Sequence, residues 1–199
     1  MKPEQQSATV QRPNLAVCKI HIKAIPGSTL ISHRLDLKVV EDFTAREFGK
    51  TKKKELRDLD KEYESCFYYT DDKKYGYPTA AFFGAVMDTA VNLDIPKTQL
   101  RRGLRFLGDI TLLKYKNINR RKDVVTNDGI SKAPNIRHRP EFVDWSCELI
   151  IQYNKDIISI DNIVNLLNHA GFSSGIGDWR PSAPKAKCPG THGMFEVTK

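Results

Sequence analysis

Apolar and polar residues alternate along several short segments of the chain, a pattern typical of half-buried β-strands. Ala16–Ala24 alternates in this way and predicts a strand, and Leu30–Val40 predicts a second strand or an extended loop. Leu104–Lys116 mixes alternating and continuous apolar pieces, which predicts a strand or a pair of strands. Val143–Tyr153 predicts a further strand, and Met194–Val197 predicts a strand that closes the chain.

Between these segments the apolar positions recur at helical spacing. Pro78 suits the first residue of a helix that runs to about Leu93 and has a strongly apolar face. Ser159 is a favourable N-cap for a second apolar helix, and Gly171 stands where a C′ glycine would end that helix. Phe43–Glu64 predicts a polar helix, because its many charges of both signs suit a solvated helical surface.

Together these elements predict an α+β fold, with an antiparallel sheet covered by helices on one face. Two β-α-β units of this kind would give a ferredoxin-like or RRM-like core carrying a basic insertion. Residues 1–14 are expected to form a disordered arm, and residues 15–199 a single domain. The apolar runs are too short to cross a bilayer, and the polar first residues lack a signal-peptide core. A soluble, cytoplasmic protein is therefore expected.

The positive charge of the chain is concentrated in one segment. The whole chain of 199 residues has a formal net charge of +8. Residues 97–139 contain twelve Lys and Arg residues but only three Asp, an excess of nine positive charges. Residues 41–64 hold seven basic and eight acidic residues, so the Lys52–Lys54 run adds no net charge to its surroundings. The 97–139 segment is thus the better candidate for binding a polyanion, and a mobile basic loop that only aids solubility is the alternative.

Glycines are frequent between the last predicted helix and the last predicted strand. Gly175 and Gly177 are followed by Trp179 and Arg180, and Lys185 and Lys187 come later in the same loop. Backbone amides in such a loop can cradle a phosphate, the indole can stack on a base, and the cations can contact phosphates. The loop lacks the G-K-[ST] of a P-loop, and its glycines do not follow a strand as in a dinucleotide fingerprint. The alternative is a connector whose glycines only turn the chain.

Two resemblances follow from these motifs. Tyr75–Phe82, Arg139–Trp145 and Asn168–Pro181 together resemble a family of phage-encoded proteins of about this length, which implies little about function. The glycine-rich ending, in which Gly190 and Gly193 precede the last strand, is similar to the glycine-rich loop of the repeat-associated RNA-binding (RAMP) proteins of CRISPR systems. The second resemblance implies a ferredoxin-like or RRM-like fold that binds RNA, and it covers only the last part of the chain.

Candidate catalytic groups are present but unconnected in the sequence. Asp71 and Asp72 could hold Mg²⁺, yet spacing supplies no third carboxylate. Asp36, Asp178 or His33 could serve a ribonuclease, although nothing in the sequence places them together. The four cysteines are scattered without a metal-binding spacing. We therefore expect no cofactor and no metal, and we favour binding over catalysis.

The leading hypothesis is a non-catalytic protein that binds single-stranded RNA or DNA, acts in the cytoplasm of a host cell if phage-encoded, and forms a homo-oligomer along the strand. The alternatives are a phage structural, assembly or anti-defence protein that docks a host protein, and a metal-dependent nuclease. The predicted nucleic-acid-binding residues combine the basic segment, the glycine-rich loop and two tyrosines from the aromatic-rich loop Cys66–Tyr77: Arg101, Arg102, Arg105, Lys114, Lys116, Arg120, Arg121, Lys122, Arg137, His138, Arg139, Gly175, Gly177, Trp179, Arg180, Lys185, Lys187, Tyr75 and Tyr77.

Overall fold

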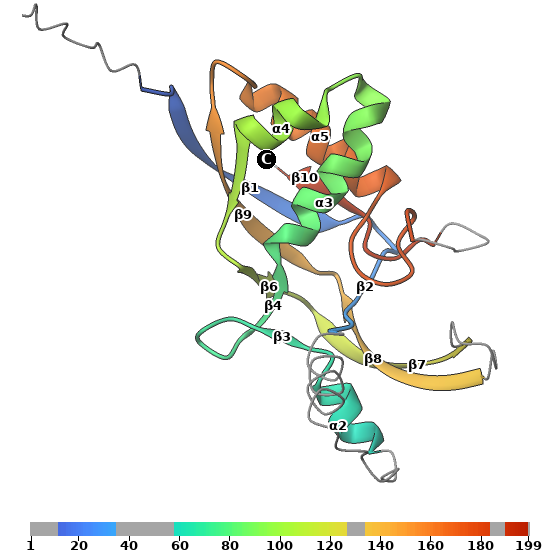
Figure 1. Ribbon diagram of the computed structural model, residues 1–199. Coiled ribbons are helices and arrows are strands. Elements are labelled where there is room, and N and C mark those ends of the chain that lie inside the picture. Colours follow the sequence, from blue (N-terminus) through green and yellow to red (C-terminus); the bar gives the residue numbers. More distant parts are fainter. Residues whose placement is uncertain (1–11, 35–57, 127–133, 184–189, 199) are drawn as a thin grey trace, which may run out of the picture.

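The computed structural model describes residues 12–34, 58–126, 134–183 and 190–198 (Figure 1). Several expectations from the sequence lie outside these ranges. They concern most of the N-terminal arm, the polar helix before residue 58, the extended segment beyond residue 34 and the loop lysines Lys185 and Lys187. The described part of the predicted polar helix ends in α2 (Leu59–Glu64). The fold class expected from the sequence is confirmed at the level of an α+β protein with an antiparallel sheet.

The larger sheet is built around two long strands. β1 (Leu15–Ala24) pairs along nearly its whole length with β9 (Ser146–Asn154) and, on its other edge, with β10 (Phe195–Thr198). The second edge of β9 is shared by β5 (Leu104–Leu107) and β6 (Ile110–Lys114), which pair with different parts of it. All these pairings are antiparallel. The sheet continues from β6 through β4 (Tyr75–Pro78) to β3 (Tyr68–Tyr69).

The helices that follow β4 and β9 lie on one face of this sheet (Figure 1). Alternate residues of β1 and β9, such as Ile22 and Leu149, point to that face and are buried there. Phe82 of α3 packs beside Trp145 and Phe195 at the centre of the core, with ring centroids 5.5–6.4 Å apart. The bounds of these helices are α3 (Thr79–Thr89), the 3₁₀ turn η1 (Ala90–Leu93), α4 (Lys97–Gly103) and α5 (Ile160–Ser173).

The end of α5 differs from the expectation. Ser159 caps its N-terminus as predicted, because its hydroxyl oxygen accepts a hydrogen bond from the Asn162 amide at 3.2 Å. Gly171, however, lies inside the helix, which continues to Ser173. A Cβ at Gly171 would lie 1.8 Å from the carbonyl oxygen of Phe195. The glycine is therefore needed for the close approach of α5 to β10 and not for a helix-ending turn.

A smaller sheet holds the second half of the basic segment. β7 (Asn117–Thr126) and β8 (Pro134–Val143) form a hairpin between β6 and β9, and the short β2 (Leu30–Ile31) pairs with the free edge of β8. The prediction of one strand over Val143–Tyr153 is wrong at its start. Asp144 adopts a positive φ of 49°, which turns the chain between β8 and β9, and the fully buried Trp145 side chain anchors that turn in the core.

Most of the aromatic-rich loop Cys66–Tyr77 is packed against the protein. It contains the β3–β4 hairpin, and its rings form a cluster in which Tyr75 stacks on Phe67 with centroids 4.6 Å apart. Phe142 of β8 meets both rings edge-on. No helix in the described ranges is both long and apolar enough to span a membrane.

Candidate nucleic-acid interface

Arg139 ties the β7–β8 hairpin to the glycine-rich loop. Its side chain is only 3% exposed, and its guanidinium lies between two carboxylates from different elements. One terminal nitrogen is 2.5 Å from Asp123 of β7, and the other is 2.5 Å from Asp178 of the glycine-rich loop. A buried arginine with two carboxylate partners is costly to disturb, because losing either side leaves an unpaired charge. Arg139 was expected at the phosphate-binding surface, and the structure instead engages it within the protein.

Asp178 also contacts a histidine from the first part of the chain. His33 Nδ1 lies 3.1 Å from Asp178 Oδ2, and Ile31 forms an isolated β-bridge with Asp178. Burial favours a higher pKa for Asp178, but the hydrogen bond and charge of His33, together with Arg139, outweigh it and lower the pKa. The structure thus brings together His33 and Asp178, which the sequence could not connect, whereas Asp36 lies outside the described residues.

A second group of polar side chains extends this junction. Arg121 contacts Asp123 at 2.9 Å and Glu141 at 3.1 Å, and the Thr29 hydroxyl donates to Glu141 at 2.8 Å. His192 completes the ring, with Nδ1 2.8 Å from the Thr29 hydroxyl and Nε2 3.3 Å from the Arg121 guanidinium. Burial and the nearby Arg121 charge lower the pKa of His192. The neutral imidazole of His192 can accept a hydrogen bond from Arg121 through Nε2 and donate one to Thr29 through Nδ1, so both of its nitrogens are hydrogen-bonded.

We refer to these eight residues as the junction network. It joins β2 and its flanks, both strands of the hairpin and both ends of the glycine-rich loop. The members of the junction network are Thr29, His33, Arg121, Asp123, Arg139, Glu141, Asp178 and His192.

A polar cavity of about 320 Å³ lies between α3 and the glycine-rich loop, beside the junction network. His33 and Asp178 reach it from the network, and Arg180 lines it from the loop. Tyr77 contributes its ring from β4, and burial raises the pKa of its hydroxyl, which therefore remains protonated at neutral pH. Asp88 of α3 completes the polar lining and accepts a hydrogen bond from Ser174 at 3.3 Å.

The glycines of the loop serve close backbone packing. Gly177 has a φ of 82°, and a Cβ there would lie 2.6 Å from the carbonyl oxygen of Ile31. The amide of Gly175 donates to Ala170 at 2.8 Å, and the amide of Asp178 donates to Ile31 at 3.1 Å. These amides satisfy carbonyls of the protein, so they are not available to cradle a phosphate. The next residue, Trp179, is 45% exposed and has a φ of 58°.

The outer face of the hairpin has a different character. Arg120 donates to Asp60 of α2 at 2.6 Å and to His138 at 3.0 Å, and it lies 4.8 Å from the centroid of the Tyr63 ring. Lys122 pairs in register with His138 and is exposed on this face, whereas Arg137 pairs with Asp123 and lies on the opposite face, that of the junction network. Among the described residues, neither Lys122 nor Arg137 has an ion-pair partner.

The remaining cations expected in one basic surface are spread along the sheet. Arg105 pairs in register with Gln152, and Lys114 pairs with Ser146, six residues away along β9. That separation is roughly 20 Å. Arg101 and Arg102 lie on α4, still further from the hairpin (Figure 1). Lys116 lies at the base of the hairpin, 3.9 Å from Asp144.

The basic segment 97–139 does not form a single surface unit, because the strands carry its two ends in different directions. Asp123, Glu141 and His192 were not expected as partners of the predicted cations, nor was Thr29 as the partner of Glu141 and His192. The alternation Arg121–Asp123 and Arg139–Glu141 could have revealed the two carboxylates, since residues two apart share a strand face. In the described ranges no three His, Cys, Asp or Glu side chains are grouped as metal ligands.

The sequence matches no known protein-family model, and it has no significant match among curated proteins.

Proposed function

We propose that the protein binds single-stranded RNA or DNA without catalysis, through the β7–β8 hairpin and the glycine-rich loop fastened to it. The observation that supports this function is the pair of ion pairs made by Arg139, which holds the basic hairpin against the loop that carries Trp179. Arg137, on the hairpin face that meets the loop, and Lys122, on the opposite face, supply cations without protein partners in the described ranges. The exposed indole of Trp179 supplies a stacking surface. Cations and a stacking ring are the two components that a strand-binding surface needs.

The proposed mechanism is electrostatic attraction of phosphates with release of counterions, followed by stacking of bases. The internal ion pairs give the hairpin a defined position before the strand arrives, so little conformational entropy is lost on binding. Sequence readout is limited, because few polar groups of this surface are free to contact base edges. A homo-oligomer that covers the strand is part of this proposal, as is action in the cytoplasm of a host cell if the protein is phage-encoded.

We further propose that the core is ferredoxin-like, with the hairpin as its basic insertion. The order β10–β1–β9–β5 supports this, with α3 and α4 connecting β1 to β5 and α5 connecting β9 to β10. This is the strand order of a β-α-β-β-α-β unit. The glycine-rich loop then follows the second helix, which supports the resemblance to RAMP proteins.

The experiment is a titration of a fluorescent oligonucleotide with the purified protein, using uridine and thymidine homopolymers. We expect affinity to fall steeply with salt. The double variant Lys122→Glu, Arg137→Glu should bind at least tenfold more weakly at low salt, because two phosphate contacts become repulsive. The matched control is Lys73→Glu, Lys74→Glu in the turn between β3 and β4, which should bind like the wild type. Absence of binding by the wild type at low salt would overturn the proposal and favour the protein-docking alternative.

A second candidate function is nuclease activity, and one contact favours it. Asp178 orients His33 through Nδ1, and both side chains line the polar cavity. A histidine held in this way can act as a general base through its other ring nitrogen. Cleavage of the bound oligonucleotide that is lost in His33→Asn, while binding is retained, would establish this activity. Intact oligonucleotide after prolonged incubation, with and without Mg²⁺, would leave binding as the function.

A further inference from the structure

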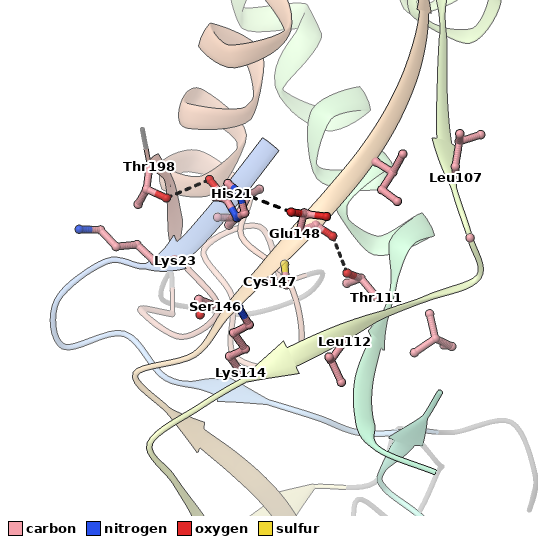
Figure 2. A pocket seen from close by; sticks show the side chains of 14 residues that line it. His21, Lys23, Leu107, Thr111, Leu112, Lys114, Ser146, Cys147, Glu148 and Thr198 are labelled. Atoms are coloured by element: carbon pink, nitrogen blue, oxygen red, sulfur yellow. Dashed lines mark hydrogen bonds and ion pairs between the residues drawn. The ribbon is translucent and has the colours of Figure 1, made fainter. Parts of the chain in front are cut away.

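The face of the larger sheet opposite the helices carries a second cavity, of about 670 Å³ (Figure 2). It forms because β5 and β6 share one edge of β9 without meeting the same part of it. β5 pairs with residues 150–153, whereas β6 pairs only with Cys147 and Ser146. Between these pairings the Glu148 carbonyl oxygen accepts from the Thr111 hydroxyl at 2.8 Å instead of from a strand amide. The sheet therefore forks at this point and leaves a hollow.

Two lysines flank a small side chain at one end of this hollow. Ser146 of β9 pairs in register with Lys23 of β1 on one side and with Lys114 of β6 on the other. Residues in register on neighbouring strands share a face, so the three side chains form a transverse row, which we name the lysine row. Adjacent strands lie about 4.8 Å apart, so the two lysine Cα atoms are separated by roughly 10 Å. All three side chains line the cavity in Figure 2.

The charges of this face leave the lysine row positive. Glu148, the carboxylate nearest along β9, is already shared by Lys19 at 3.2 Å and His21 at 3.4 Å. Lys23 contacts Glu196 at 3.1 Å, but both side chains are about half exposed, and such pairs are weak enough to exchange. Lys114 has no ion-pair partner in the described part of the chain. An anion between the two lysines would therefore meet two cations and the Ser146 hydroxyl.

The wall beside the lysine row is apolar. Leu107, Leu112 and Ile150 line the same cavity and are each about two-fifths exposed. A ligand that fits must combine an anionic group with a flat apolar surface at short range. A nucleotide has this combination, because its phosphate and base are separated by one sugar. The hydrophobic contact favours the base, and the charge favours the phosphate.

The lysine row is also continuous with the hairpin. Two residues separate Lys114 from the start of β7, and two residues separate Ser146 from the end of β8. The Lys116 amide donates to the Val143 carbonyl oxygen at 3.0 Å and closes the base of the hairpin between them. A bound nucleic-acid strand that leaves the hairpin at its base can therefore pass directly onto the open face of the larger sheet.

We propose that the lysine row and the adjoining apolar wall form a second nucleotide-binding site, which takes a phosphate between Lys23 and Lys114 and its base against Leu112. The ligand is one nucleotide unit of the same single strand. This inference rests on the proposed function and extends the proposed binding surface from the hairpin to the open face of the sheet, where Lys23 and Ser146 were not expected to take part.

The decisive variant is Ser146→Glu, which places a carboxylate between the two lysines without removing either of them. We expect it to weaken oligonucleotide binding roughly tenfold at low salt, because the new carboxylate replaces the phosphate as their partner. The matched control is Gln152→Glu, which makes the same charge change on the same strand and face, beside Arg105. It should weaken binding less than twofold. Equal weakening by both variants would overturn the proposal.

A second variant keeps the inference testable if Ser146→Glu folds poorly, which circular dichroism would reveal. Lys23→Gln with Lys114→Gln should reduce the slope of log affinity against log salt by about 0.7, the value for one phosphate contact on a single strand. The pair Lys74→Gln, Lys155→Gln should leave the slope unchanged. An unchanged slope in the lysine-row variant would overturn the proposal.

The outcomes separate this inference from the proposed function. If the hairpin variant Lys122→Glu, Arg137→Glu loses binding while Ser146→Glu does not, the hairpin binds the strand and the lysine row does not. If the wild type binds no oligonucleotide, the proposed function itself fails. Titration with uridine monophosphate and with inorganic phosphate tests the source of the nucleotide. Either compound binding as tightly as the oligonucleotide would show a free-nucleotide or phosphate site and would overturn the assignment to a strand.

Discussion

Arg139 and Asp178 lie 39 residues apart in the chain, yet their side chains meet at 2.5 Å and join the basic hairpin to the glycine-rich loop. Asp123 holds the other side of the same guanidinium at 2.5 Å. A buried charge therefore ties the hairpin to the loop, in addition to the apolar packing of Phe142 at the base of β8. This arrangement makes the geometry of the proposed binding surface dependent on a few ionic contacts, which can be tested one at a time.

Replacing Arg139 should destabilise the protein strongly. In Arg139→Met, Asp123 and Asp178 would remain partly buried without their main cation, and such losses cost about 3–5 kcal/mol. Chemical unfolding monitored by circular dichroism measures this change. The control Arg137→Met, at a position without an ion-pair partner in the described ranges, should cost less than about 1 kcal/mol. Similar values for the two variants would show that the buried ion pairs add no net stability.

The junction network should make stability sensitive to mild acid through His192. The pKa of this histidine is lowered in the folded protein, from an ordinary value of about 6.5 in the unfolded chain. Its contribution is therefore present above pH of about 6.5 and is lost as the pH falls through the lower folded pKa, because the unfolded chain binds the proton first. His192→Gln should flatten the decline of unfolding free energy between about pH 7 and 5.

The control for this pH dependence is His169→Gln, which removes an exposed histidine from α5. In this variant the free energy of unfolding should fall between about pH 7 and 5 as steeply as in the wild type. A decline in His192→Gln as steep as in the wild type would show that protonation of His192 is not coupled to folding.

Two glycines beside the polar cavity should respond in opposite ways to alanine. Gly177→Ala places a Cβ 2.6 Å from the Ile31 carbonyl oxygen at a φ of 82°, so we expect a loss of about 1–3 kcal/mol. Gly84 lies inside α3, and a Cβ there meets nothing within 4 Å. Gly84→Ala should therefore stabilise the protein by about 0.5–1 kcal/mol. Thermal unfolding of both variants measures the sign of each change in stability. A stabilised Gly177→Ala variant would contradict the packing role of that glycine.

The sequence predicted the elements whose packing is local and apolar. The alternation in Ala16–Ala24 and the cap at Ser159 depend on neighbouring residues, and both are confirmed. The hairpin was not predicted, because its two faces are both largely polar and the two-residue hydrophobic period is absent. Arg121 and Asp123 face the junction network while Arg120 and Lys122 face the other way, and no difference in hydropathy separates these pairs.

The candidate site shows the same limit. His33 and Asp178 are 145 residues apart, and only the bridge between Ile31 and Asp178 places them together. Charge counting identified the basic segment but could not show which cations are neutralised inside the protein. The pairing of Arg139 with two carboxylates engages it within the protein, whereas the register of Ser146 with two lysines adds Lys23 and Ser146 to the proposed surface, and no sequence pattern marks those two residues.

Trp179 provides a direct optical test of the proposed function. The chain has two tryptophans, of which Trp145 is fully buried and Trp179 is 45% exposed. Iodide in solution reaches only exposed indoles, so it should quench only the Trp179 part of the tryptophan fluorescence. A bound single strand that stacks on the indole should quench the same part and protect it from iodide. In Trp179→Ala the remaining emission should be insensitive to oligonucleotide, and affinity should fall by about 1–3 kcal/mol, the loss of one stacked base. Tyr69→Ala, which removes an exposed ring from β3, serves as the control. Saturation with oligonucleotide that leaves Trp179 accessible to iodide would place the strand away from the glycine-rich loop.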